Sequence, residues 1–330
     1  MHRIAGLFLT VIFVTATAAE PVTVYNFARA ESDRTIRYVY QQIGFGALHH
    51  DRMPPALDEQ PVIRMNRDTL YSTGVLDLSK PATVIMPDAD GRFMNLHVIN
   101  QDHYSFAVTG PGEHVLTEEA IGSRYAYLII RTFVDPGDPA DVASANKAQD
   151  GIKIKGGADG PLDVPDWDED QLLVARQALN TLASLGTGTA RAFGTNDEVD
   201  SIEHLMLAAA GWGGLPQKTA IYQIASVRDN DGTPHAVTVT DVPVDAFWSV
   251  TVYNAEGYIE ENELGVYSFN GVTAQHNDDG SVTLQFGGCD DGRVNCIPIS
   301  EGWSYTVRMY EPHPEVLDGT WVFPAPEPIN

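Results

Sequence analysis

The chain has 330 residues, of which 43% are hydrophobic and 20% are charged. This apolar content is sufficient for a well-buried core, so long-range disorder is not expected. Asp and Glu outnumber Lys and Arg by 45 to 20, which gives a formal net charge of −25. A surface this negative repels nucleic-acid phosphates, so the composition argues against a nucleic-acid partner.

Residues 1–19 have the pattern of an export signal. His2 and Arg3 precede an apolar run over Ile4–Val14, and Ala16-Thr17-Ala18 matches an A-x-A cleavage site. The apolar run is short for a membrane anchor, and no Cys follows the site. We therefore expect a periplasmic or secreted protein, with no stable membrane insertion after the signal is removed.

Cys289 and Cys296 are the two cysteines of the chain. In an oxidising compartment, two cysteines this close predict a local disulfide, which would stabilise the fold by about 2.5 kcal/mol. A free thiol and a metal pair are the alternatives. Asp290 and Asp291 beside Cys289 would raise the pKa of a thiol and weaken it as a nucleophile, so the bridge is favoured.

The sequence of the first half of the chain predicts one helix followed by strands. Apolar residues at helical spacing predict a helix from about Glu31 to Leu48, with Ser32 as its cap. From Val62 to Phe133 short apolar runs alternate with turn residues, as in strands. Residues 135–165 are rich in Asp, Gly, Pro and Lys and predict a linker or an exposed loop.

The second half begins with helices and returns to strands. Helices are predicted over Asp166–Leu185 and Asp197–Ala210. Five later runs predict strands: Val237–Val242, Phe247–Asn254, Tyr267–Phe269, Val282–Phe286 and Tyr305–Tyr310. Short strands with Gly and Asp turns indicate a sandwich or jelly roll. The predicted parts are a β domain over 20–165, a helical element over 166–214 and a β domain over 215–330.

The familiar catalytic motifs are absent from the sequence. It contains no G-x-S-x-G, H-E-x-x-H, C-x-x-C or G-x-x-x-x-G-K pattern. His49-His50 would point in different directions on regular structure, and the acidic turns do not form a twelve-residue calcium loop. We therefore expect no nucleotide or other cofactor and no metal.

Several sequence blocks resemble a known family. Asn66–Ser72, Phe247–Asn254 and Asp318–Trp321 are among the matching blocks. They resemble a bipartite bacterial family whose halves are the domains of unknown function 1254 and 1214. The resemblance implies a mainly β fold, in which an immunoglobulin-like β-sandwich is followed by a jelly-roll domain, with a small helical insertion. It implies no reaction and no catalytic residues.

The predicted strand Phe93–Tyr104 has one partly polar face. Asn95 and His97 lie on that face, and Asp102 and Tyr104 follow shortly after it. An imidazole near a carboxylate suits acid–base catalysis, because the carboxylate fixes the tautomer. We predict His97 as the proton-transfer group, oriented by Asp102 and assisted by Tyr104, with Asn95 binding substrate. The alternative is a buried histidine with a purely structural role.

The block Asn66–Tyr71 lies at a predicted strand entry. Alternation places Asn66 and Asp68 on one face and Arg67 and Tyr71 on the other. These four residues are predicted to bind substrate through its carboxyl or hydroxyl groups. The alternative is an internal network of salt bridges and turns that stabilises the domain.

Aromatic residues gather in the C-terminal half of the sequence. Trp248 and Trp303 are predicted to form a platform for a sugar or a lipid. Packing in the core is the more common role for such side chains. Both interpretations remain open from the sequence.

Three classes of function follow from these features. The leading hypothesis is an exported enzyme that acts on a small organic molecule by acid–base chemistry, in a cleft near the domain junction. The alternative is a non-catalytic envelope protein that binds a carbohydrate or a lipid. A structural or interaction protein is the third hypothesis. Homo-oligomers are common among soluble proteins, so a homo-oligomer is one of the assemblies expected for this protein.

Overall fold

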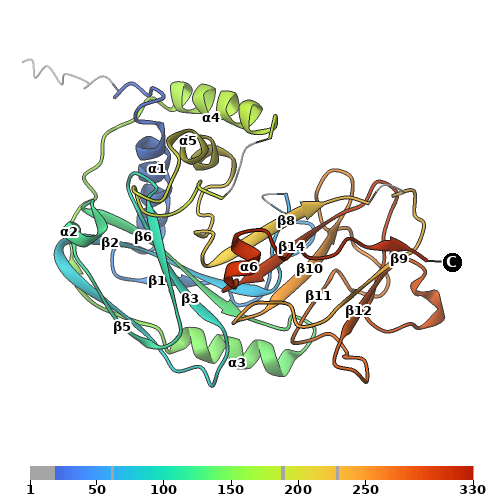
Figure 1. The fold of residues 1–330 in the computed structure, drawn as a ribbon. Coiled ribbons are helices and arrows are strands. Elements are labelled where there is room, and N and C mark those ends of the chain that lie inside the picture. Colours follow the sequence, from blue (N-terminus) through green and yellow to red (C-terminus); the bar gives the residue numbers. More distant parts are fainter. Residues whose placement is uncertain (1–18, 61–62, 187–189, 228–229, 330) are drawn as a thin grey trace, which may run out of the picture.

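The computed structural model describes residues 19–60, 63–186, 190–227 and 230–329. The protein is mainly β with few helices, as predicted, and Figure 1 shows its sheets and covering helices. The predicted export signal lies, but for its last residue, outside the described residues. No helix in the described ranges is long and apolar enough to cross a membrane.

The N-terminal half contains one seven-stranded sheet. Strands β1, β2, β6, β3 and β4 follow one another across it, and β5 and β7 pair with the second part of β2. The strands are β1 (Leu48–His50), β2 (Thr69–Met86), β3 (Met94–Asn100), β4 (Ser105–Thr109), β5 (Gly112–Leu116), β6 (Tyr125–Phe133) and β7 (Lys153–Ala158). The length of β2 lets it serve as the common partner of four strands.

Alternation along the strands separates two apolar faces of this sheet. Leu96, Val98 and Leu128 belong to one core, which β5 and β7 help to enclose. On the other face, the helix α1 (Phe27–Ile43) packs Ile36 and Val39 against β2, β3 and β6. The short helix α2 (Glu118–Ile121) precedes β6. The sheet is therefore buried on both faces.

Three helices form a layer beside this sheet (Figure 1). They are α1, α4 (Glu169–Ala183) and α5 (Ser201–Ala210), and the last two confirm the predicted helices. The carboxylates of Asp168 and Asp200 accept hydrogen bonds from the first-turn N–H groups of α4 and α5. Helix α1 begins earlier than predicted, after Asn26, so Ser32 lies inside the helix and is not its cap. It also ends earlier, because Gly44 adopts a φ of 71° after Ile43.

The prediction of a linker over 135–165 is wrong. This segment contains α3 (Pro139–Asp150), which begins after the capping residue Asp138, and then β7. Val142 and Ala145 of α3 pack with Leu70 and Val134. Because few of its positions are apolar, the segment has the composition of a loop. These few apolar side chains are nevertheless enough to dock α3.

The C-terminal half contains two four-stranded sheets. One has the order β11-β10-β14-β8 and the other has the order β13-β12-β9-β15. The strands are β8 (Ala220–Ala225), β9 (His235–Val239), β10 (Trp248–Tyr253), β11 (Ser268–Asn270), β12 (Val282–Phe286), β13 (Cys296–Ile297), β14 (Ser304–Tyr310) and β15 (Glu327–Pro328). The short helix α6 (Pro314–Leu317) follows β14. One hydrophobic core joins the two sheets, while the immunoglobulin-like and jelly-roll assignments and the domain boundaries stay predictions.

The predicted disulfide is confirmed. Cys289 and Cys296 are bonded, with 5.6 Å between their Cα atoms. The bridge joins the 3-10 turn Cys289–Asp291 to β13 and so closes the loop that follows β12. It fixes the end of one sheet of the C-terminal half.

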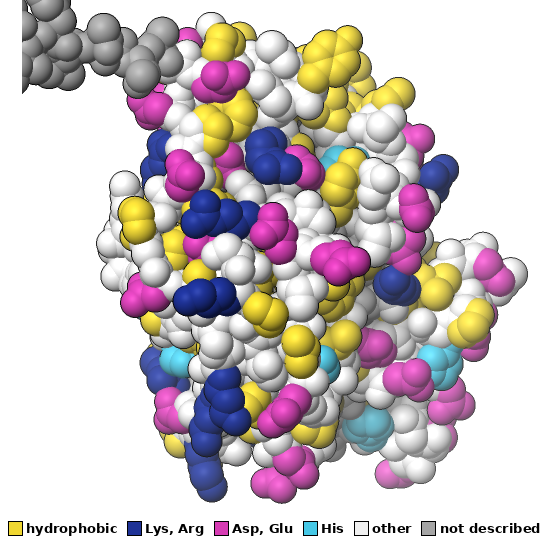
Figure 2. Space-filling view, turned by 90° about the vertical axis from the view of Figure 1, so that its left-hand side faces the viewer, with side chains coloured by type: hydrophobic (Ala, Val, Ile, Leu, Met, Phe, Trp, Pro, Cys, Tyr) yellow, Lys and Arg dark blue, Asp and Glu magenta, His cyan; other side chains and the backbone are white. Residues whose placement is uncertain are grey.

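The surface carries both acidic and basic side chains. Figure 2 shows the side of the molecule at the left of Figure 1, where acidic and basic side chains are interspersed. The excess of negative charge is therefore not gathered into a single patch on this face. Side chains of predominantly one charge are instead found around two cavities, which are described below.

Candidate functional site

A cavity of about 360 Å³ lies between the two halves of the chain. The loop before β2, together with β2 and β6, contributes residues from the first half, and β8 and β14 contribute residues from the second. Its lining residues are Pro55, Arg64, Met65, Asn66, Tyr71, Arg131, Tyr222, Ile224, Thr306, Arg308 and Tyr310. These described lining residues include three arginines and no Asp or Glu, so we call it the basic cavity.

Arg308 of β14 is held at the cavity by its own hydrogen bonds. Its side chain is buried, and Nη1 donates to Thr251 Oγ1 at 3.0 Å. Nη2 donates at 2.8 Å to the carbonyl oxygen of Arg64 and to the hydroxyl of Tyr253. Burial lowers the pKa of Arg308, but Tyr253 and the Asp68 carboxylate contribute to a net increase. The cavity therefore contains a fixed positive charge.

Arg131 of β6 places a second cation beside Tyr71. Its Nη2 donates to the carbonyl oxygen of Gly213 at 3.0 Å, and its guanidinium lies 5.5 Å from the ring centre of Tyr71. Burial alone would raise the pKa of Tyr71, but the charge on Arg131 and a hydrogen bond from Asn66 contribute to a net decrease. The Tyr71 hydroxyl therefore loses its proton more readily than an ordinary tyrosine.

Arg64 lines the same cavity and carries a buried donor without a partner within the described ranges. Its Nη1 is buried and has no hydrogen-bond partner among the described residues, and neither has Thr306 Oγ1. The backbone of Arg64 has a φ of 55°, which is unusual for a residue with a side chain. Its N–H donates to the carbonyl oxygen of Gly257 at 2.8 Å, which helps to hold this conformation. A buried unpaired donor costs about 1–3 kcal/mol, so it calls for a ligand or a water.

Three tyrosines line the cavity with opposite tendencies to ionise. Asn66 Nδ2 donates to the Tyr310 hydroxyl at 2.9 Å and lies 3.5 Å from the Tyr71 hydroxyl. Burial raises the pKa of Tyr222 and raises that of Tyr310 strongly, whereas the pKa of Tyr71 is lowered. Groups whose surroundings move their pKa values apart are typical of sites with an acid and a base.

The four residues predicted from the Asn66–Tyr71 block are divided between two places. Asn66 and Tyr71 line the basic cavity, whereas Arg67 and Asp68 line a separate cavity of about 260 Å³. The predicted alternation is wrong at this point, because β2 begins only at Thr69 and the preceding residues are not in a strand. Irregular backbone brings Asn66 to the same side as Tyr71.

Arg67 and Asp68 have structural partners. Arg67 Nη1 donates to the carbonyl oxygen of Pro55 at 2.9 Å, and its guanidinium lies 5.5 Å from the ring centre of Tyr267. The buried carboxylate of Asp68 accepts a hydrogen bond from Ser249 Oγ at 2.5 Å. Burial raises the pKa of Asp68 more than nearby positive charge lowers it. Asp68 and Ser249 thus connect the two halves of the chain.

The predicted pair of His97 and Asp102 is wrong. Asp102 forms an ion pair with Arg29, with Arg29 Nε 2.7 Å from Asp102 Oδ1. His97 is fully buried, with Nδ1 3.4 Å from Arg131 Nη1 and with Nε2 lacking a partner in the described part of the chain. Burial, followed by the positive charge of Arg131, lowers the pKa of His97 well below its usual range. His97 is therefore neutral and contacts a cavity residue instead of lining the cavity itself.

Tyr104 and Asn95 also lie outside the lining of the basic cavity. The ring of Tyr104 stacks on His204 at 4.7 Å, and burial raises the pKa of its hydroxyl. Asn95 is fully buried and its Nδ2 donates to Thr109 Oγ1 at 3.0 Å. The turn after β3 carries Asp102 and Tyr104 toward the helices, which a strand pattern alone does not reveal.

Trp248 and Trp303 belong to the core of the C-terminal half. They are 6% and 0% exposed, and Trp303 stacks on Phe286 at 5.1 Å. A surface platform formed by these two rings is therefore excluded. Core packing was the open alternative in the sequence, and it is the role that the structure assigns to both.

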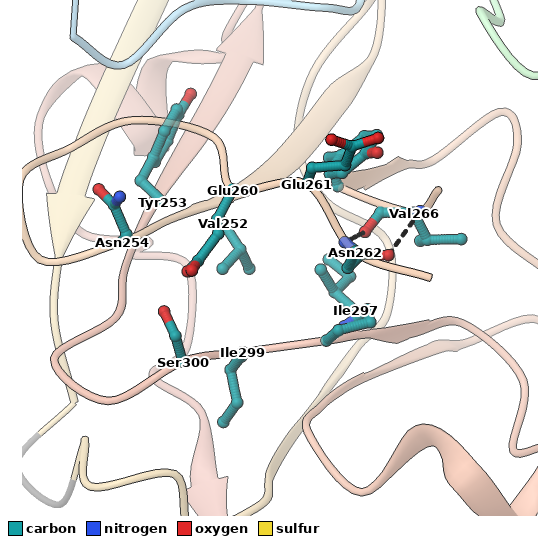
Figure 3. A pocket seen from close by; sticks show the side chains of 12 residues that line it. Val252, Tyr253, Asn254, Glu260, Glu261, Asn262, Val266, Ile297, Ile299 and Ser300 are labelled. Atoms are coloured by element: carbon teal, nitrogen blue, oxygen red, sulfur yellow. Dashed lines mark hydrogen bonds between the residues drawn. The ribbon is translucent and has the colours of Figure 1, made fainter. Parts of the chain in front are cut away.

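A smaller pocket of about 210 Å³ lies in the C-terminal half (Figure 3). Figure 3 shows the side chain of Glu260 directed toward Ser300, while Glu261 points away from that segment. Across the described ranges, no group of three or more His, Cys, Asp or Glu side chains could hold a metal ion. The lining of this pocket includes the two carboxylates Glu260 and Glu261, so its charge differs from that of the basic cavity.

Sequence reasoning missed most of the basic cavity. Arg131 and Arg308 lie within the apolar runs that form β6 and β14, where the alternation of residues predicts strands and no site. A charged side chain inside a buried strand is rarely placed there without a partner. That signal was present in the sequence and could have identified both arginines.

Two family models match the chain. The model described as protein of unknown function DUF1254 matches residues 45–156, and DUF1214 matches residues 223–314. The chain therefore belongs to the bipartite family that carries DUF1254 in its N-terminal half and DUF1214 in its C-terminal half. Each of the two matches contributes residues to the basic cavity.

The fold of the chain matches that of a solved structure. The chain is similar to the VPA0106 protein from Vibrio parahaemolyticus, with 18% identity and a TM-score of 0.69 over 93% of this chain and 98% of that one. An uncharacterised protein from Burkholderia cenocepacia is 14% identical, with a TM-score of 0.47 over 86% of this chain and 84% of that one. The chain matches no curated protein.

Proposed function

We propose that this protein is an exported enzyme that acts on a small organic anion by acid–base chemistry in the basic cavity. The observation that carries the proposal is the set of three arginines, Arg64, Arg131 and Arg308, around a space whose described lining contains no carboxylate. In a chain with a net charge of −25, such a cluster favours a negatively charged ligand. The disulfide supports an oxidising compartment and hence export.

A carboxylate is the ligand group that suits this lining. Arginine donors match a carboxylate in geometry as well as charge, and Arg64 Nη1 and Thr306 Oγ1 lack other partners. The volume of about 360 Å³ lies within the range of small-molecule sites. Arg308 would contribute charge more than direct contact, because Thr251, Tyr253 and a backbone carbonyl already occupy both of its terminal nitrogens.

Tyr71 is the proposed proton-transfer group. In its ionised form it would take a proton from a carbon or a hydroxyl next to the ligand carboxylate, and the bonding electrons would stay on the ligand. The positive charge of Arg131 favours both the ionised tyrosine and the new negative charge on the ligand. Tyr310, whose pKa is raised, would remain protonated and could return a proton.

Binding is tested by calorimetry with a panel of small carboxylates, inorganic phosphate and sulfate. We expect at least one carboxylate to bind, and Arg64→Met to weaken it at least tenfold. Arg67→Met is the matched control, since Arg67 is also half-buried and lies on the neighbouring cavity. The proposal fails if no anion binds to the folded wild-type protein, or if the two variants bind equally well.

Catalysis is tested separately from binding. A bound carboxylic acid is incubated with the protein in deuterium oxide, and exchange of its protons is followed by NMR. We expect Tyr71→Phe to keep the affinity and to slow exchange by at least about 100-fold, the usual contribution of a positioned base. If no ligand that binds shows exchange, the site is a non-catalytic receptor for organic anions.

A further inference from the structure

A second and larger cavity lies between the two halves of the chain. Its volume is about 740 Å³. Its lining comes from the turn before β3, the β4–β5 turn, the end of β6, helix α3, the segment before β10 and the residues that follow β11 and β14. The lining includes five carboxylates and one guanidinium, so we call it the acidic cavity. Its charge is thus opposite to that of the basic cavity.

The apolar part of this cavity is aromatic. Phe93, Phe133 and Phe247 line it and pack on one another edge to face, with 5.4 Å between Phe93 and Phe247 and 4.8 Å between Phe133 and Phe247. Aromatic rings attract organic cations through their negative faces, in addition to providing apolar contact. The three rings therefore suit a ligand with an apolar body and a positive group.

The carboxylates of this cavity are not neutralised by its single guanidinium. Arg92 is engaged by Asp141, with 2.5 Å between Nη2 and Oδ1. Glu311 is half-buried, and its carboxylate accepts a hydrogen bond from Thr109 Oγ1 at 2.5 Å. No basic side chain other than Arg92 is present among the described residues that line the cavity. An ammonium group would supply the missing positive charge.

We propose that the acidic cavity binds an organic cation, namely an ammonium group attached to an aromatic or aliphatic body. The apolar body would pack on the three phenylalanines, and the ammonium would pair with Glu311. This inference goes beyond the proposed function, because it assigns a different ligand class to a different cavity. Phe247 stacks on Tyr310 at 4.4 Å, and Tyr310 lines the basic cavity, so the aromatic cluster is a wall between the two sites.

Calorimetry on the full chain tests the proposal with three probes of similar shape. They are 2-phenylethylammonium, the neutral 2-phenylethanol and the anionic phenylacetate. We expect the ammonium to bind at least tenfold more tightly than the alcohol, and phenylacetate not to compete with it. Equal affinity for the ammonium and the alcohol would contradict the proposal, as would the absence of ammonium binding by the folded protein.

Matched variants assign the binding to this cavity. Glu311→Gln removes the charge with little change of shape and is expected to weaken the ammonium at least tenfold. Glu315→Gln makes the same change of charge outside the cavity lining and should bind like the wild type. A second variant, Ser144→Trp, fills the cavity from the exposed side of α3 and should weaken both the ammonium and the alcohol.

Two results would overturn the assignment. One is equal binding by the Glu311 and Glu315 variants, and the other is unchanged binding by the Ser144 variant. Arg64→Met should leave the ammonium affinity unchanged, so failure of the anion site and failure of this site can be told apart. Thermal melting of each variant verifies that it is folded before binding is compared.

Discussion

Acid should destabilise the protein through a buried histidine in the turn after β3. His103 is buried, and its Nε2 accepts a hydrogen bond from the N–H of Gly213 at 3.0 Å. Its Nδ1 has no partner in the described part of the chain, and its ring lies 5.4 Å from those of Trp212 and His204. Burial, with a smaller contribution from His204, lowers the pKa of His103 to about 3.

The size and sign of the effect follow from this pKa. In the unfolded chain His103 has a pKa near 6.5, so between pH 6.5 and about 3 the unfolded state binds the additional proton. The free energy of unfolding therefore falls as the pH is lowered through this window. Its slope from this one group approaches about 1.4 kcal/mol per pH unit, and the full loss is about 5 kcal/mol.

Urea unfolding of the wild type and of His103→Asn between pH 7.5 and 4.5 measures this slope. Asparagine tolerates the φ of 68° at this position and does not titrate. The variant should be less stable at pH 7.5, because it loses ring contacts, but its stability should fall less steeply with acid, by about 1 kcal/mol per pH unit. Parallel pH curves for the two proteins would refute the assignment of a buried neutral His103.

Other perturbations act on packing and on covalent structure. Cys289→Ser removes the bridge to Cys296 and should lower the free energy of unfolding by about 2.5 kcal/mol in urea, and reductant should affect only the wild type. Gly214→Ala would bring a Cβ to 2.4 Å from the Phe193 ring, so we expect a loss of about 1–3 kcal/mol and a lower Tm. Trp303→Ala should cost about 3–5 kcal/mol by the same urea assay, whereas an unchanged Tm would contradict its place in the core.

Much of the fold could be predicted from local patterns. Tyr125–Phe133 is uniformly buried as β6, and the helices predicted over Asp166–Leu185 and Asp197–Ala210 are present as α4 and α5, so pattern and structure agree there. Helix α3 could not be predicted, because only a few of its residues are apolar and its stability comes from docking. Intrinsic helix propensity is a weak predictor where tertiary packing determines whether a helix forms.

The candidate site was predicted less well than the fold. The sequence predicts a cleft near the domain junction and a substrate-binding role for Asn66 and Tyr71, which both line the basic cavity. The partners Arg131 and Arg308 come from strands far apart in the sequence, so their convergence depends on how the two halves meet. Local alternation also fails where the backbone turns, as it does before β2 and after β3.

The hydrogen bonds between the two halves bear on how the family can change in evolution. Ser249 of one half satisfies the buried Asp68 of the other, and Arg308 and Tyr253 hold the backbone at residues 64 and 65. A half imported from another protein would leave a buried carboxylate or carbonyl without its donor, at a cost of about 1–3 kcal/mol for each lost bond. Recombination at the boundary is therefore penalised unless both partners of each bond are inherited together.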